Sequence, residues 1–99
     1  MNMAIQIKLE NFEGPLDLLI HLIDKNQMSI TEIDISKIIE DYLSYISEAQ
    51  ELNLKIKVEF LVMATELIEI KAYSILDKGK KEEKEEDLEK RIIEYKMFK

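Results

Sequence analysis

The sequence predicts an all-α fold, a small helical bundle of three to four helices with a short extended N-terminal arm. The 99 residues include only two glycines and one proline, too few for a turn-rich β protein. Apolar residues make up 46% of the chain and recur at helical spacing over long stretches. The length allows one domain at most.

The arm is expected over residues 1–12. Ile5, Ile7 and Leu9 alternate with polar residues, which is the period of a short half-buried strand. Because the rest of the chain offers no second strand, we expect this segment to be extended and to lie on the helices. The helical core follows over residues 13–76.

The first helix should begin at Gly14-Pro15. Proline is favoured at the first helical position, since its missing N–H would be unpaired there anyway. Asp17 adds negative charge to the first turn, where the helix dipole favours it. His21 has Asp17 and Lys25 as its helical neighbours, which predicts a structural histidine without catalytic duty. The wide apolar stripe that implies burial consists of Leu16, Leu18, Leu19, Ile20, Leu22 and Ile23.

The second helix is expected to run to about Ala49, with residues 51–55 as a connector. Its apolar positions at helical spacing are Ile35, Ile38, Ile39, Tyr42, Leu43 and Ile46. Just before it, Ser29 with Glu32, or Thr31 with Asp34, fits a capping-box pattern. Asp34 or Ser36 could then be the N-cap of the second helix itself.

The third helix is predicted from Ile56 to Leu76, a stretch without glycine or proline. Its polar residues gather where Glu59, Glu66 and Glu69 project. One apolar stripe consists of Phe60, Met63, Leu67 and Ile70, and a second of Leu61, Ala64, Ile68, Ala72 and Ile75. Together they are wider than a helix on a small core needs. Either the other helices cover both stripes, or one stripe is left for a partner in a helix-in-groove contact.

Residues 77–87 form a charge-dense run, DKGKKEEKEED, which predicts a solvated, mobile linker. An apolar pattern returns with Leu88 and Ile92. We therefore expect residues 88–99 to be the start of a fourth helix, beginning near Asp87.

The charge of the chain argues against nucleic acid as a direct partner. The net charge is −7, and all of the excess lies in residues 1–76, which carry thirteen acids and six bases. An acidic body repels phosphate backbones and suits a basic or mixed protein surface better. The chain has no cysteine, no basic leader and no apolar run long enough for a membrane span. The expectation is a cytoplasmic protein with no membrane contact.

No motif for catalysis, cofactor binding or metal binding is visible. Glycines at 14 and 79 alone cannot build a phosphate-binding loop, and there is no metalloprotease or nucleophile-elbow pattern. The acids of residues 82–87 are interleaved with lysine and do not converge as a cation site requires. Tyr42, Tyr45 and Tyr73 are instead candidates for a protein contact, since tyrosine is favoured at interfaces. The sequence predicts a non-enzymatic protein without cofactors.

Four stretches in order resemble one family. They are NFEGPLDLLIHLI, ITEIDISKIIEDYLSYI, VEFLVMATELIEIKAYSIL and RIIEYKMFK, and together they resemble the amino-terminal domain of bacterial segregation and condensation protein A, the kleisin subunit of the SMC complex. The similarity runs from about Ile5 to Lys99. The family often differs at three positions of this chain: Asp34, Lys55 and Val58.

The resemblance implies a module that binds the coiled-coil neck of an SMC ATPase beside its head. It further implies a role in chromosome condensation and segregation near the nucleoid. Segregation and condensation protein B would be a partner of the full complex, through regions beyond this chain. The residues expected to face the neck are Tyr42, Tyr45, Ile46, Leu61, Ile68, Ala72 and Tyr73, with the other stripe of the third helix on the first helix. The alternative reading is a self-associating helical scaffold, in which the isolated chain is a homodimer.

Overall fold

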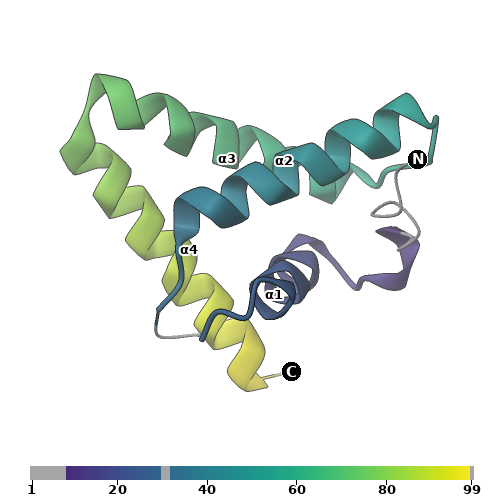
Figure 1. Cartoon of the computed structure of the whole chain (residues 1–99), viewed down its shortest axis with the longest axis horizontal. Coiled ribbons are helices and arrows are strands. Elements are labelled where there is room, and N and C mark those ends of the chain that lie inside the picture. The colour runs from purple at the N-terminus through teal and green to yellow at the C-terminus, as the bar shows by residue number, and fades with distance from the viewer. Residues whose placement is uncertain (1–8, 30–31, 99) are drawn as a thin grey trace.

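Helices dominate the computed structural model, which describes residues 9–29 and 32–98. Four α-helices follow one another in the described residues: α1 (Pro15–Lys25), α2 (Ile35–Glu51), α3 (Val58–Leu76) and α4 (Lys78–Phe98). Helices α2 and α3 lie side by side, and α4 turns away from the end of α3 and descends past α1 (Figure 1). The all-α prediction is confirmed.

The predicted arm is only partly within the described residues. Ile5 and Ile7 lie outside them. Leu9 begins a short 3-10 helix, η2 (Leu9–Asn11), closed by a hydrogen bond from the Phe12 amide to the Leu9 carbonyl at 3.1 Å. Leu9 itself is buried in the core. The extended conformation predicted for residues 9–11 is therefore wrong, because burial of the Leu9 side chain is achieved by a turn.

The starts of α1 and α2 follow local rules. Pro15 occupies the first helical position of α1 with Gly14 as its N-cap, as predicted. Asp34 caps α2 by accepting a hydrogen bond from the Lys37 amide at 3.2 Å. Of the two caps that the sequence left open, Asp34 is thus the one used, and Ser36 lies inside the helix. Thr31 lies outside the described residues.

The ends of α1 and α2 share one motif that needs no glycine. Gln27 and Asn53 both have a positive φ, 58° and 56°. In each case the next amide bonds back to a carbonyl five residues earlier, Met28 to Ile23 and Leu54 to Ala49. This pairing is the Schellman arrangement, in which a left-handed residue satisfies the last carbonyls of a helix. Both helices therefore end without a glycine, because Gln27 and Asn53 adopt the left-handed conformation instead.

The linker predicted at residues 77–87 is wrong, since α4 begins at Lys78. Asp77 ends α3 and also caps α4, accepting a hydrogen bond from the Lys80 amide at 3.0 Å. Lysine and glutamate are good helix formers, and the pairs Lys81–Glu85 and Glu86–Lys90 lie one turn apart at 3.6 and 3.8 Å. This charge-dense run is helical although it contains Gly79, because Leu88 and Ile92 anchor the helix in the core.

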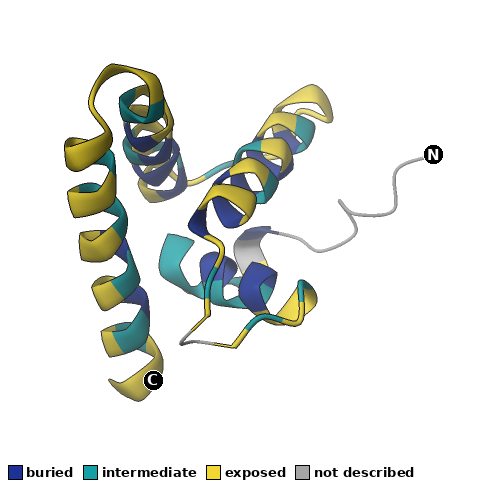
Figure 2. Ribbon diagram, turned by 60° about the vertical axis from the view of Figure 1, so that its left-hand side comes forward, coloured by how far each residue is buried: buried dark blue, intermediate teal, exposed yellow. Residues whose placement is uncertain are grey.

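The core lies where α1, α2, α3 and the second half of α4 meet. Figure 2 shows the buried residues of each helix facing inward and the exposed ones facing out. The largest side chains with less than 2% exposure are Leu18, Leu19, Leu22, Ile23, Ile38, Tyr42, Phe60, Leu67, Ile70, Leu88 and Ile92. The core accordingly draws on every α-helix, while much of the surface of α3 is left to solvent.

Candidate protein-interaction surface

Helix α3 has two apolar faces, one of which is buried while the other is largely exposed. The stripe of Phe60, Met63, Leu67 and Ile70 is buried in the core, to which α1 also contributes. In the second predicted stripe, Ala64 is buried and Leu61 is partly covered. Ile68 and Ile75, by contrast, are 54% and 87% exposed. The other helices therefore do not cover both stripes.

Along one face of α3, residues that are exposed or only partly buried form a regular seam. We call it the α3 seam, and it consists of Val58, Leu61, Thr65, Ile68, Ala72 and Ile75. The intervals alternate between three and four residues, which is the heptad spacing by which one helix packs against another in a coiled coil. Beside it, Val62 and Leu76 add exposed apolar surface. A seam of this kind suits a helical partner.

Thr65 is the one polar residue of the α3 seam. Its hydroxyl donates a 2.6 Å hydrogen bond to the Val62 carbonyl of the same helix. A buried hydroxyl is costly only when it has no partner. Because Thr65 is already satisfied within α3, it can be covered by another helix without that penalty.

The residues predicted on α2 lie in a different place. Tyr42, Tyr45 and Ile46 are all less than 5% exposed, so their predicted role at the surface is corrected: they belong to the core of this fold. The Tyr42 hydroxyl donates a 2.8 Å hydrogen bond to the Phe60 carbonyl, joining α2 to α3. Burial raises the pKa of Tyr42 well above its ordinary value. Burial, and secondarily the Glu48 carboxylate, raises the pKa of Tyr45.

The predicted residues on α3 fall on and beside the α3 seam. Ile68 and Ala72 are exposed, and Leu61 is partly buried against the core. Tyr73 is partly covered on the side of α4, where the Lys80 ammonium lies 5.9 Å from the centre of its ring. The structure thus brings Leu61, Ile68 and Ala72 together and separates them from the α2 residues. Val58 and Val62 are not among the contact residues predicted from the sequence, although extending the heptad spacing by one position would have included Val58.

Ion pairs to α4 border one side of this face. Arg91 pairs with Glu66 through a short contact, and Lys84 lies 3.9 Å from Glu69. On the other side, Lys57 and Lys71 are exposed, and no ion pair of the described residues includes either of them. The two borders of the face therefore differ in charge.

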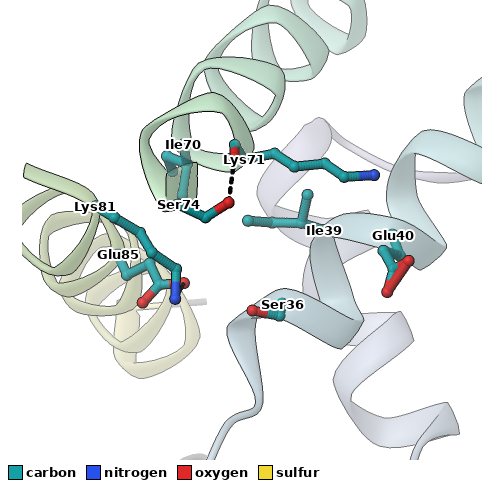
Figure 3. Close-up of a pocket in the computed structure, with 8 residues that line it drawn as sticks. All are labelled: Ser36, Ile39, Glu40, Ile70, Lys71, Ser74, Lys81 and Glu85. Carbon is teal, nitrogen blue, oxygen red and sulfur yellow. Dashed lines mark hydrogen bonds and ion pairs between the residues drawn. The ribbon is translucent and has the colours of Figure 1, made fainter. Parts of the chain in front are cut away.

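A pocket lies between α2, α3 and α4. Its volume is about 210 Å³. Figure 3 shows its lining: Ser36, Ile39, Glu40, Ile70, Lys71, Ser74, Lys81 and Glu85. The Ser74 hydroxyl donates to the Lys71 carbonyl at 2.6 Å, and Lys81 pairs with Glu85. No hydrogen bond of the described residues joins the hydroxyl of Ser36 or Ser74 to a histidine or a carboxylate, the pairing by which a base activates a nucleophile.

His21 packs against Phe12 within the fold. Its ring lies 5.4 Å from that of Phe12, tilted by 56°, and its Nε2 atom is buried without a hydrogen-bond partner among the described residues. Asp17 accepts a hydrogen bond from the Glu13 amide at 3.1 Å. Within residues 9–29 and 32–98 no group of three metal-ligating side chains converges. No helix of that part of the chain is long and apolar enough to span a membrane.

The fold and this surface define a small all-α module with one exposed apolar helical face. The family described as segregation and condensation protein ScpA matches residues 22–99. The chain belongs to this family.

Relatives named segregation and condensation protein A are similar over nearly the whole chain. One from Clostridium perfringens (strain SM101 / Type A) is 56% identical, covering 100% of this chain and 42% of its own length. Those from Clostridium acetobutylicum and Caldanaerobacter subterraneus are 45% and 46% identical, covering 98% and 94% of this chain and 42% and 41% of their own lengths. The chain thus spans about two fifths of the length of the curated relatives it matches.

Proposed function

We propose that this chain is a non-catalytic kleisin-type module whose α3 seam docks on the coiled-coil neck of an SMC ATPase. Through that contact it contributes to chromosome condensation and segregation in the cytoplasm, beside the nucleoid. Segregation and condensation protein B joins the same complex through regions of the protein outside this chain. Family membership supports the general role, and the exposed seam supports the mode of binding.

The observation that carries the proposal is the heptad spacing of the α3 seam, whose residues are exposed except for the partly buried Leu61. A coiled coil presents helices, and a helix packs best on another helix whose apolar residues repeat at intervals of three and four. The α3 seam has this repeat over 18 residues, about 26 Å along the helix axis. A surface of such length and regularity is more than a scattering of single exposed apolar residues.

The docking set differs from the one that the sequence suggested. Leu61, Ile68 and Ala72 remain in it, and Val58 and Ile75 join at its two ends. Tyr42, Tyr45 and Ile46 are buried in the core, and Tyr42 holds α2 against the buried face of α3 through its hydrogen bond to the Phe60 carbonyl. Tyr73 lies at its border toward α4. The contact is therefore made by α3 and needs no opening of the core.

The test is a binding titration of this chain against an SMC protein that retains its head and neck. Ile68→Glu places a charge at the centre of the α3 seam, and we expect affinity to fall about 100-fold or more, as for a central interface residue. Because Ile68 is exposed, circular dichroism should show unchanged helicity. Unchanged affinity of Ile68→Glu would contradict the proposal.

A matched pair of substitutions controls for the general effect of a new charge. Ile75 and Phe98 are both 87% exposed, but only Ile75 belongs to the α3 seam. We expect Ile75→Glu to weaken binding and Phe98→Glu to leave it within about twofold of the wild type, as for a residue outside the interface. Equal effects of the two would show that the seam has no special role.

A further inference from the structure

The α3 seam has two chemically different edges. The edge toward α2 is formed by Lys57, Ala64 and Lys71, each of which directly precedes the first seam residue of a heptad. Ala64 is buried, and Lys71 lines the pocket shared with α2. The edge toward α4 is formed by Val62, Glu69 and Leu76, and Glu69 is paired with Lys84 of α4. In coiled coils these edge positions determine which partner helix binds, and in which orientation.

The two lysines of the α2-side edge have no carboxylate partner in the described chain. Glu40 of α2 lines the same pocket as Lys71 without forming an ion pair with it. Lys57 is the N-cap of α3 and makes no side-chain capping bond, at a helix end where the dipole disfavours a positive charge. These cations stand on a chain whose net charge is −7.

We infer that the α2-side edge selects a partner helix with carboxylates opposite Lys57 and Lys71. The two lysines are fourteen residues apart, so the acids of the partner should be separated by two heptads, about 21 Å along its axis. This inference rests on the proposed function, because it specifies the chemistry of the helix that the α3 seam binds. Paired edge charges add specificity and faster association more than raw affinity.

The same edges disfavour a second copy of this chain on the seam. In a parallel pair, each lysine would face the fifth residue after it in the other copy, which is Val62 for Lys57 and Leu76 for Lys71. In an antiparallel pair, the two lysine-bearing edges would lie together, and like charges repel. Neither orientation supplies a carboxylate to the lysines, so the charge pattern favours a different partner over self-association.

The experiment compares two double substitutions of equal net charge. Lys57→Glu/Lys71→Glu reverses the edge, and Lys78→Glu/Lys96→Glu reverses two exposed lysines of α4 that form no ion pair in the described residues. Titrated against the SMC protein with its head and neck at about 0.1 M salt, the edge variant should bind about tenfold more weakly, and the α4 variant should stay within about twofold. At about 1 M salt the difference should largely vanish.

The outcomes separate this inference from the proposed function. If Ile68→Glu abolishes binding while both double variants bind alike, the seam binds the neck and the edge inference is overturned. If the wild type does not bind the SMC protein, both are overturned. Light scattering tests the inference that the edge charges disfavour self-association. A monomer at all concentrations is expected, and a dimer that Ile68→Glu dissociates would overturn it.

Discussion

Both faces of α3 carry apolar residues at helical spacing, but the structure buries one of them and leaves most of the other exposed. Leu67 is fully buried, and Ile68, the next residue, is 54% exposed. A hundred degrees of rotation about the helix axis separates them. The comparison teaches that apolar spacing defines faces, whereas the neighbouring helices decide which face is covered. In this chain the second face is left over.

The comparison is tested most strongly by removing one side chain from each face. Leu67→Ala should lower the free energy of unfolding by about 2–5 kcal/mol, because it leaves a cavity in the core. Ile68→Ala should change it by no more than about 0.5 kcal/mol, because its side chain is half in water. Denaturant titrations of both variants measure the difference. Similar costs would mean that the seam is covered in the folded chain.

A single hydrogen bond sharpens the buried side of the comparison. Tyr42→Phe removes the bond from the Tyr42 hydroxyl to the Phe60 carbonyl and should cost about 1 kcal/mol at neutral pH. The pKa of Tyr42 is raised in the folded state above its ordinary value of 10. Its stabilising contribution is therefore intact below about pH 10 and is lost as the pH rises further, since the unfolded state then releases the proton first.

Alkaline titration supplies the control for that variant. Above about pH 10 the gap between wild type and Tyr42→Phe should narrow by up to about 1.4 kcal/mol per pH unit. The other tyrosines ionise in both proteins, so their effects cancel in the comparison. A gap that stays constant from pH 7 to 11 would show that Tyr42 is not protected from ionisation in the folded chain.

The smallest effect is expected at the border between the exposed face and α4. Glu66→Gln/Glu69→Gln removes the charges that pair with Arg91 and Lys84 while keeping the side-chain size. Each exposed pair contributes only about 0.2–1 kcal/mol, so the melting temperature should fall by a few degrees at low salt. At about 1 M sodium chloride the difference should disappear. A large, salt-independent loss would mean that these glutamates pack rather than pair.

Local signals in the sequence were sufficient for the fold class and for most helix starts. Pro15 and Asp34 act through their own backbone neighbours, so their positions as first residue and cap can be predicted without knowing the rest of the fold. Asp77 uses the same local chemistry, yet it was missed because the charges after it suggested a solvated linker. The density of charge in residues 77–87 could not show that Leu88 and Ile92, which follow, hold the helix in the core.

The candidate surface, too, could be predicted only in part, because local spacing shows which residues share a face and does not show what covers that face. The spacing on α3 identified a surplus apolar face that includes Leu61, Ile68 and Ala72. The assignment of Tyr42, Tyr45 and Ile46 to the surface failed because a helical period gives the relative angles of residues but no outside reference. A tyrosine on a wide apolar face looks the same whether it meets a partner or the core.

By itself, therefore, the sequence determined that the chain is helical, where most of its helices begin, and that α3 has more apolar surface than its core requires. Only the tertiary structure decided that the face with Phe60, Leu67 and Ile70 is the buried one, and that the α3 seam stays open. Helix formation depends on residues a few positions apart, which the sequence displays directly. Burial depends on contacts between residues far apart in the chain, such as Tyr42 with Phe60, and only the packed fold defines them.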